Sequence, residues 1–188
     1  MRKVHTLEGI SIRTMPSDST RFIIEPLDPA KHRREAFDCG VAPLNEFLRT
    51  RARKEAEAGM SVCFVAVPRD QASRVAGFYT LSATIIVRTE LADALTKKLP
   101  RYRELPATLL GRLARSLDFK GERLGDLLMV SALCRAVEGA KQVASWAVVT
   151  DPKDQNARKF YENFGFRPLT PERLFLPMEA AASVVSAR

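Results

Sequence analysis

The second half of the chain alternates between helical and strand-like segments, and this alternation limits its fold more than any other feature. Residues 124–137 place apolar side chains at helical spacing, with Gly139 expected to end the helix, and residues 143–149 form an apolar run typical of a buried strand. Residues 154–164 have the pattern of a short helix followed by Gly165. Strands separated by helices pair in parallel, because the crossover returns the chain to the same end of the sheet. We therefore expect an α/β domain with a parallel pair in this half.

The middle of the chain predicts antiparallel pairing instead. Residues 61–67 and 75–87 are rich in β-branched and aromatic side chains, and Pro68 starts a turn between them, so they are expected to form a hairpin. A further strand is expected over residues 107–115. The sheet is therefore predicted to be mixed, mostly antiparallel and flanked by helices, which is an α+β variant of the α/β class.

The remaining segments predict short helices and outer strands. An amphipathic helix is expected between Pro43 and Gly59, because Leu44, Phe47 and Leu48 form one apolar stripe. The other expected elements are a strand over residues 21–27, a helical turn over 30–37, a helix over 90–97, and closing strands over 166–168 and 174–178.

Length and composition favour one ordinary globular domain. The chain has 188 residues, of which 46% are hydrophobic and 28% are charged, so it can bury a sizeable core without disulfides. We expect a flexible tail over residues 1–19, a single domain over 20–180 and a C-terminal tail over 181–188. No apolar run approaches the ~18 residues of a membrane span, and the first residues do not resemble a signal peptide, so a cytoplasmic location is the default expectation.

The cysteines and histidines argue against metal or thiol chemistry. Cys39, Cys63 and Cys134 are widely separated and lack zinc-ligand spacing, so we interpret them as reduced thiols. His5 and His32 are the two histidines of the chain, and both precede its main body, which disfavours a histidine-based nucleophile. We expect no bound metal.

The net charge of +8 favours a polyanionic partner. The basic residues gather in three groups, which are Lys31, Arg33 and Arg34; Arg49, Arg51, Arg53 and Lys54; and Lys97, Lys98, Arg101 and Arg103. Each group alone is an ordinary solvated surface. Together they indicate a nucleic acid or a phosphorylated cofactor.

Two segments carry candidate chemistry. Tyr161 is a phenol with an ordinary pKa of about 10, so it is protonated at neutral pH and can donate a proton to a departing thiolate. Phe160, Tyr161 and Phe164 also fit an apolar core stripe, and this alternative stays open. Residues 120–125 place two glycines at the start of a helix, where backbone N–H groups without partners can bind a pyrophosphate. The alternative for this segment is an ordinary surface turn.

A phosphate-binding loop followed by a strand and a helix with Asn156 and Tyr161 resembles the layout of the GNAT N-acetyltransferase superfamily. The family motif is glutamine or arginine, any two residues, glycine, any residue, and then glycine or alanine. Lys120 stands at its first position, Arg123 at the central glycine and Gly125 at the last. Arg123 fits this position if its φ stays negative, and its guanidinium can then reach a phosphate. The alternative is that its bulk weakens binding of the cofactor.

Five segments resemble the GNAT toxins of bacterial toxin–antitoxin modules, in the order of that family. They are residues 37–48, 77–82, 99–102, 110–114 and 160–166. The resemblance implies a GNAT fold whose parallel pair splays around acetyl-CoA. It also implies a toxin that acetylates the α-amine of aminoacyl-tRNA and so blocks translation, a ribbon-helix-helix antitoxin that neutralises it, and a homodimer.

The same resemblance implies roles for single residues. Tyr161 is implied as the general acid, and Asn156 as a neighbour of the cofactor. The other implied cofactor contacts are the backbone of Leu113, Ala114 and Arg115 for the acetyl and pantetheine groups, and the loop of Lys120, Gly121, Glu122, Arg123, Leu124, Gly125 and Asp126 for the pyrophosphate. The chain departs from the family at Arg115, Ser116 and Leu117, where a small apolar residue and an acid are usual.

The residues favour an α-amine acceptor on one independent ground. A lysine ammonium has a pKa of about 10.4 and needs a base, whereas an α-amine with a pKa of about 8 is partly neutral without one. The strand over 109–115 contains no acid, although Asp118, Glu122 and Asp151 stay possible bases. Candidate tRNA contacts are Arg49, Arg53, Lys97 and Lys98, because phosphates can be bound with little sequence information. Some of these cations could bind an acidic antitoxin segment instead.

Two other interpretations stay open. The chain could acetylate a small-molecule or protein amine, which the positive charge disfavours. It could also be a non-catalytic binding module with the GNAT fold, which the arginine at position 123 would explain.

Overall fold

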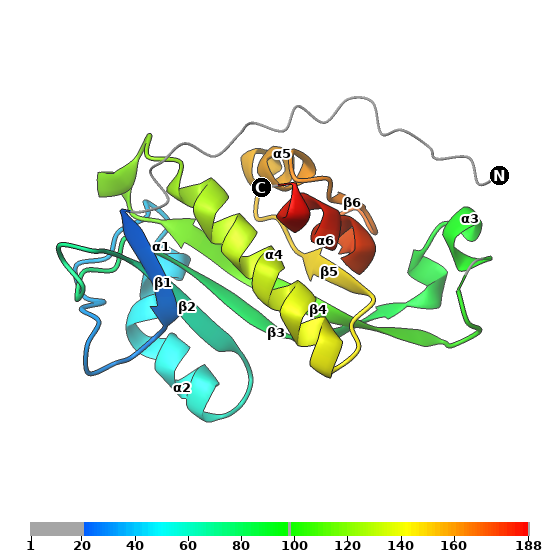
Figure 1. Cartoon of the computed structure of the whole chain (residues 1–188), viewed down its shortest axis with the longest axis horizontal. Helices are drawn as coiled ribbons and strands as arrows, with labels where there is room; N and C mark the ends of the chain where they lie inside the picture. Colours follow the sequence, from blue (N-terminus) through cyan, green and yellow to red (C-terminus); the bar gives the residue numbers. More distant parts are fainter. Residues whose placement is uncertain (1–20, 98, 188) are drawn as a thin grey trace.

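A mixed sheet forms the frame of the molecule. The computed structural model describes residues 21–97 and 99–187. Within this part of the chain, seven strands follow the spatial order β1-β2-β3-β4-β5-β7-β6, and helices cover both faces (Figure 1). The strands are β1 Phe22–Pro26, β2 Val62–Pro68, β3 Gly77–Val87, β4 Glu104–Arg115, β5 Ala147–Thr150, β6 Arg167–Pro168 and β7 Leu174–Pro177.

One long helix and several short ones connect the strands. The chain passes from β1 to β2 through α1 Ala42–Glu46, the π-helical turn η2 Phe47–Arg51 and α2 Ala52–Glu57. The other helical elements are η3 Arg88–Glu90, α3 Asp93–Thr96, η4 Leu117–Phe119, α4 Leu124–Gln142, α5 Gln155–Glu162 and α6 Met178–Ser186.

The predicted mixed pairing is confirmed. β1, β2, β3 and β4 pair antiparallel in chain order, and β7 pairs antiparallel with both β5 and β6. β4 and β5 pair in parallel, through Ala107 with Ala147, Thr108 with Val148 and Leu109 with Val149. The crossover between them contains α4, as the alternation in the second half of the sequence predicts.

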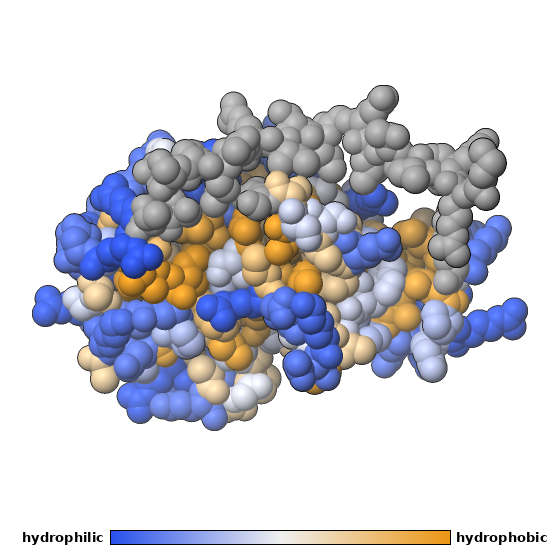
Figure 2. Space-filling view, viewed as in Figure 1, coloured by the Kyte–Doolittle hydropathy of each residue, from blue (hydrophilic) through white to orange (hydrophobic). Residues whose placement is uncertain are grey.

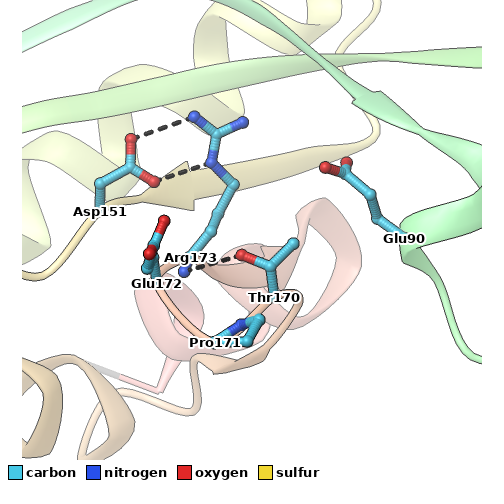
Figure 3. Close-up of a pocket in the computed structure, with 6 residues that line it drawn as sticks. All are labelled: Glu90, Asp151, Thr170, Pro171, Glu172 and Arg173. Carbon is cyan, nitrogen blue, oxygen red and sulfur yellow. Dashed lines mark hydrogen bonds and ion pairs between the residues drawn. The ribbon is translucent and has the colours of Figure 1, made fainter.

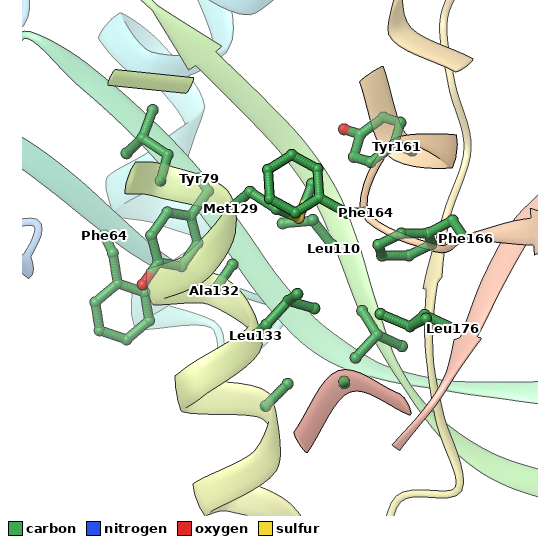
Figure 4. Close-up of a cluster of buried hydrophobic side chains, with 14 of the residues drawn as sticks. Phe64, Tyr79, Leu110, Met129, Ala132, Leu133, Tyr161, Phe164, Phe166 and Leu176 are labelled. Carbon is green, nitrogen blue, oxygen red and sulfur yellow. The ribbon is translucent and has the colours of Figure 1, made fainter. Parts of the chain in front are cut away.

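Successive residues of each strand face different helices, so the sheet has two distinct faces. On the α4 face, Tyr79, Leu110 and Val148 pack with α4, α5 and α6 in the main cluster of buried side chains (Figure 4). On the opposite face, which we call the α1–α2 face, Phe78 and Ala114 pack with η2 and α2. A third cluster lies beneath η3 and α3 on this second face. The core is therefore built from both sides of β3 and β4.

The surface is not uniform. Figure 2 shows hydrophilic side chains over the end of the molecule that carries α2, and apolar side chains around the outer ends of β3 and β4. Ile85 on β3 is 44% exposed there. The basic residues of η2 and α2 thus lie on a polar end of the molecule.

Two predicted element boundaries and one predicted helical turn are wrong. α4 does not end at Gly139 but continues to Gln142, because one glycine weakens a helix by only about 1 kcal/mol relative to alanine. The next strand begins at Ala147 instead of residue 143. Residues 30–37 form non-helical turns, not the expected helical turn. The His32 ring accepts a hydrogen bond from the Asp28 N–H, and the backbone N–H of His32 donates to the Asp28 carbonyl, so His32 is held to the residues before the segment.

The predicted C-terminal tail over residues 181–188 also needs correction. Residues up to Ser186 form α6, in which Ala181 is fully buried in the main cluster and Val184 and Val185 pack against it partly buried. These small apolar residues recur at helical spacing, which explains the packing of α6 on α4. The predicted tail over residues 1–19 and the candidate Lys98 lie outside the described residues.

Candidate active site

β4 and β5 part from each other beyond their short parallel pairing. β5 ends at Thr150, whereas β4 continues to Arg115. A β-bulge lies at this point, since Thr80 pairs with Arg112 and Leu81 with Leu110, leaving Gly111 as the extra residue. A bulge bends its strand, and glycine suits this one because a Cβ at Gly111 would lie 3.3 Å from the Thr80 Oγ1. The last five residues of β4 therefore continue past the end of β5 and border an opening in the sheet.

A hydroxyl and a phenol lie at the closed end of this opening. The Thr150 Oγ1 donates a hydrogen bond to the Leu110 carbonyl at 3.0 Å. Tyr161 reaches the same place from α5, whose first turn is capped by Asp154, because the Ala157 N–H donates to the Asp154 Oδ1 at 2.8 Å. Burial raises the pKa of Tyr161, and a hydrogen bond with the Thr150 side chain partly opposes that rise. The phenol thus stays protonated at neutral pH and can act as a proton donor.

The aromatic side chains at the end of α5 form a core stripe, and one of them is also the candidate proton donor. The Tyr161 ring meets Phe160 and Phe166 edge-on, at centroid distances of 5.5 and 5.6 Å. Figure 4 shows its hydroxyl oxygen directed away from Phe166 and towards β4. Phe164 is buried in the main cluster. The stripe is therefore part of the core, and one of its rings also carries a polar atom to the opening in the sheet.

The predicted phosphate-binding loop lies beside α5. α4 begins at Leu124, and its first hydrogen bonds run from the Asp126 and Leu127 N–H groups to the Arg123 carbonyl. The amides before Asp126 thus belong to the start of the helix, where the helix dipole favours an anion. Gly121 has a φ of +90°, and a Cβ built on Gly125 would lie 3.7 Å from the Phe160 ring. The two segments singled out in the sequence therefore meet in space.

Arg123 does not satisfy the condition expected for it. Its φ is +52°, in the left-handed region, so the condition of a negative φ is not met. The conformation costs a residue with a Cβ roughly 1–2 kcal/mol, whereas glycine, which the family motif has at this position, can adopt it freely. The guanidinium lies on Asp126, with the Arg123 Nε 3.1 Å from the Asp126 Oδ2. Arg123 therefore holds a backbone conformation suited to glycine, and its side chain folds back onto the first turn of α4.

We expect the Arg123→Gly variant to have a free energy of unfolding about 1 kcal/mol higher than the Arg123→Ala variant. Both substitutions remove the guanidinium, so the difference isolates the cost of a Cβ in the left-handed conformation. Urea denaturation of the two purified variants measures this difference. Equal stabilities would mean that the loop does not hold position 123 at positive φ.

The other predicted site residues occupy different positions around the opening. Leu113, Ala114 and Arg115 are the last residues of β4, and Asn156 is exposed in the first turn of α5. Lys120 and Gly121 are exposed, whereas the Leu124 side chain is fully buried, so only its backbone can contribute to a site. Of the predicted tRNA contacts, Arg49 and Arg53 lie exposed on η2 and α2, and Lys97 lies exposed after α3.

The possible bases are engaged in ion pairs. Glu122 binds Arg21 at 2.6 Å and Asp118 binds Arg74 at 2.6 Å. Asp151 directly follows β5 and holds Arg173 through two hydrogen bonds of 2.7 and 3.1 Å. Asp151 is thus the candidate base adjacent in sequence to Thr150, but both of its oxygens accept from a guanidinium.

A cavity of about 530 Å³ lies beside this ion pair (Figure 3). Its lining consists of Glu90, Asp151, Thr170, Pro171, Glu172 and Arg173. Three carboxylates against one guanidinium make it acidic, in contrast with the basic chain as a whole. Sequence reasoning missed this cavity, because its residues come from three separate connections of the sheet. It also missed Thr150, whereas a glycine inside the expected strand at 111 was a signal for the bulge.

The thiols have no part in this site. Cys39, Cys63 and Cys134 form no disulfide, and burial raises the pKa of Cys63 to about 12. Among the residues that the structure describes, no three histidine, cysteine or acidic side chains gather as metal ligands. The helices of this part of the chain include none with the length and apolarity needed to cross a membrane.

Curated relatives match nearly the whole chain. A probable toxin, TacT of Sinorhizobium fredii strain NGR234, is 29% identical over 172 residues, which cover 87% of this chain and 94% of the relative. A tRNA-acetylating toxin of Mycobacterium tuberculosis strain H37Rv is 32% identical over 152 residues, which cover 80% of this chain and 89% of the relative. No protein-family model matches the chain.

Solved structures of similar proteins share the fold. A tyrosine-to-phenylalanine variant of KacT has a TM-score of 0.82 at 26% identity, over 87% of this chain and 99% of the other. AtaT complexed with acetyl-methionyl-tRNAfMet has a TM-score of 0.80 at 26% identity, over 87% and 98% of the two chains. AtaTR bound with acetyl-CoA has a TM-score of 0.77 at 26% identity, over 88% and 98%. The chain therefore belongs to the family of tRNA-acetylating toxins and has their GNAT acetyltransferase fold.

Proposed function

We propose that this protein is a toxin that transfers the acetyl group of acetyl-CoA to the α-amine of an amino acid carried by tRNA, and so blocks translation. The observation that carries the proposal is the position of the Tyr161 phenol at the closed end of the opening between β4 and β5, next to a helix start suited to a pyrophosphate. The relative named as a tRNA-acetylating toxin supports the substrate. A charged-tRNA substrate places the activity in the cytoplasm.

The cofactor is proposed to run along the opening. Its pyrophosphate binds the amides of residues 121–125, with Lys120 and Asn156 at the rim and Glu122 and Asp126 beside the loop. The pantetheine arm follows the backbone of Leu113, Ala114 and Arg115 and brings the thioester towards Tyr161. The AtaTR structure with acetyl-CoA supports this cofactor for the fold. No step of this path involves a metal.

The reaction needs one proton donor and one neutral amine. The amine nitrogen attacks the thioester carbonyl, a C–N bond forms, the C–S bond breaks, and Tyr161 gives its proton to the departing sulfur. The extra proton on nitrogen then returns to the phenolate through water. An α-amine with a pKa of about 8 is partly neutral at physiological pH, so no strong base is required for the attack.

The acidic cavity favours a second candidate function. Glu90, Asp151 and Glu172 would attract a small cationic amine to the end of β5, as an acetyltransferase for a polyamine would require. The net charge of +8 and the tRNA-acetylating relative favour the first candidate.

A comparison of acceptors tests the two candidates. CoA release is measured with acetyl-CoA and, in parallel, a pool of charged tRNA, the same pool after deacylation, a polyamine and a short peptide. We expect release with charged tRNA and none with deacylated tRNA. Faster release with the polyamine or the peptide would instead support the second candidate. Binding of acetyl-CoA without release of CoA in any mixture would favour the non-catalytic binding module.

Arg49 and Arg53 are proposed to bind tRNA phosphates. Arg53 pairs with Glu57 at 2.7 Å, and the side chain of Arg49 lies 3.8 Å from Glu46. Exposed pairs of this kind contribute little to stability, so both cations can turn to a phosphate. We expect the Arg49→Gln, Arg53→Gln double variant to raise the KM for charged tRNA about tenfold and to lower the slope of log affinity against log salt by roughly 2.

A control substitution distinguishes direct contacts of Arg49 and Arg53 with tRNA from a general effect of lost positive charge. Lys141 also pairs with a glutamate one helical turn away, but it lies at the far end of α4. Lys141→Gln is expected to leave the KM for charged tRNA within about twofold, and neither substitution should change acetyl-CoA binding. If the Lys141→Gln variant raised the KM as much as the Arg49→Gln, Arg53→Gln double variant, specific contacts at Arg49 and Arg53 would be contradicted.

Two partners complete the proposal. A ribbon-helix-helix antitoxin and a second copy of the chain are implied by the resemblance to the GNAT toxins. The hydrophilic end of the molecule (Figure 2) carries Arg49 and Arg51 of η2 and Lys54 of α2, and it is a suitable surface for an acidic antitoxin segment. Light scattering on the purified protein, alone and with any small ribbon-helix-helix protein encoded by a neighbouring reading frame, tests both partners.

A further inference from the structure

The Thr150 hydroxyl lies where β4 and β5 separate. Thr150 is the last residue of β5 and is 1% exposed. Its Oγ1 donates to the carbonyl of Leu110, which is the first β4 residue beyond the parallel register pairs. A side chain therefore adds one hydrogen bond between the two strands after their backbone pairing has ended. This bond fixes the direction in which the hydroxyl oxygen presents its lone pairs.

Thr150 and Tyr161 meet on the α4 face of the sheet. Leu110, Val148 and Tyr161 belong to the same cluster of buried side chains, and Thr150, two residues after Val148 on β5, faces the same side of the sheet. The Thr150 side chain also opposes the rise that burial causes in the pKa of Tyr161. Because both hydroxyls are buried, water cannot readily replace either partner. The Tyr161 ring is also held by Phe160 and Phe166, so the phenol has little freedom to seek another partner.

The number of hydrogens on the two hydroxyl groups determines which of them donates and which accepts the hydrogen bond. A threonine hydroxyl has one hydrogen to donate and two lone pairs to accept with, and a phenol likewise has one hydrogen. While the Thr150 hydrogen points to the Leu110 carbonyl, Thr150 can only accept from Tyr161. Once Tyr161 has given its proton to a departing thiolate, its oxygen is negative and requires a donor. The Thr150 hydrogen then has to rotate from the Leu110 carbonyl to the phenolate.

We propose that Thr150 is a positioning residue for the general acid: it orients the Tyr161 phenol in the resting enzyme and donates a hydrogen bond to the phenolate formed during acetyl transfer. This inference rests on the proposed acetyl transfer and on Tyr161 as its acid. The C–S bond breaks, the Tyr161 proton moves to sulfur, and the proton released by the amine later restores the phenol. Thr150 gains and loses no proton in the cycle. Its hydrogen changes only its acceptor.

A double-mutant cycle with Tyr161→Phe tests the inference. Thr150→Val keeps the shape of the side chain and removes the hydroxyl. We expect it to lower kcat about tenfold or more, because a hydrogen bond to a charged group is lost, with the KM for acetyl-CoA unchanged. In the Tyr161→Phe background the same substitution should lower kcat by less than about twofold, since no phenolate then forms. Thr150→Ser, which retains a hydroxyl, should recover most of the wild-type kcat.

Thr108 provides a matched control. It lies on the neighbouring strand β4, and its hydroxyl is hydrogen-bonded to the Ser145 hydroxyl at 2.9 Å. Thr108→Val should leave kcat within about twofold, so a general loss of β-sheet hydroxyls is distinguished from the loss at Thr150. Thermal unfolding and acetyl-CoA binding of each variant identify any that fail to fold. Thr150→Ser can be scored even if Thr150→Val does not fold.

Failure of the inference about Thr150 can be distinguished from failure of the proposed tRNA acetylation. All variants are assayed with the acceptor that the wild-type protein acetylates fastest, so a different acceptor would refute tRNA acetylation without affecting the cycle. A Thr150→Val variant with wild-type kcat would overturn the inference. Full additivity of the two substitutions would overturn it as well, as would a Tyr161→Phe enzyme with unchanged kcat, because Thr150 would then have no acid to position.

Discussion

Replacing Tyr161 by phenylalanine is expected to lower kcat by about a hundredfold or more and to leave acetyl-CoA binding unchanged. The substitution removes one oxygen atom from a side chain that is 7% exposed and packed between Phe160 and Phe166, so the fold should tolerate it. Without the phenol, CoA has to depart as an unprotonated thiolate. CoA release at saturating acetyl-CoA measures the first effect, and calorimetric titration with acetyl-CoA measures the second.

Tyr102 provides the control for a missing phenol. It is 67% exposed and precedes β4, so Tyr102→Phe should leave both kcat and acetyl-CoA binding within about twofold of the wild type. A Tyr161→Phe variant with more than a third of the wild-type kcat would contradict the role of the phenol as the acid. Tyr161 would then be only a core aromatic residue, as the helical stripe of α5 alone allows.

Replacing Gly125 by aspartate is expected to weaken acetyl-CoA binding by about a hundredfold or more. The position is in the first turn of α4, where a pyrophosphate is proposed to bind the backbone amides. An aspartate there places a negative charge beside the phosphates, and like charges in contact cost several kcal/mol. The helix itself should not suffer, because acidic side chains are favourable near a helix N-terminus.

Gly125→Ala is the matched control. A Cβ at this position would lie 3.7 Å from the Phe160 ring, which is an ordinary van der Waals contact. We expect its dissociation constant for acetyl-CoA to stay within about threefold of the wild-type value, as measured by calorimetry. Equal affinities of the aspartate and alanine variants would contradict a pyrophosphate site at the start of α4.

The parts of the site that depend on local sequence could be predicted. The helix with Tyr161 and the glycine-containing start of α4 were both expected from residue spacing, because caps, glycines and apolar periodicity act over a few residues. The parallel pair followed from the alternation of elements, since a parallel pair requires a long crossover connection and α4 supplies one between β4 and β5. These features fix the frame around the opening between β4 and β5.

The parts that depend on distant contacts could not be predicted. Thr150 is part of the site through a hydrogen bond to Leu110, a residue forty positions earlier, and no local pattern marks such a partner. The left-handed φ of Arg123 arises because the loop has to turn into α4, whatever residue occupies the position. α6 forms because α4 provides an apolar surface for Ala181, whereas the last residues alone indicated a tail.

The most direct test of the central claim is the identification of the product formed on charged tRNA. The protein is incubated with acetyl-CoA and a mixed pool of charged tRNA, the aminoacyl esters are hydrolysed, and the released amino acids are analysed by mass spectrometry. We predict amino acids acetylated on the α-amine, formed by the wild-type protein and nearly absent with Tyr161→Phe. Unmodified amino acids from the wild-type reaction, together with rapid acetylation of a polyamine or a peptide in a parallel reaction, would contradict the claim.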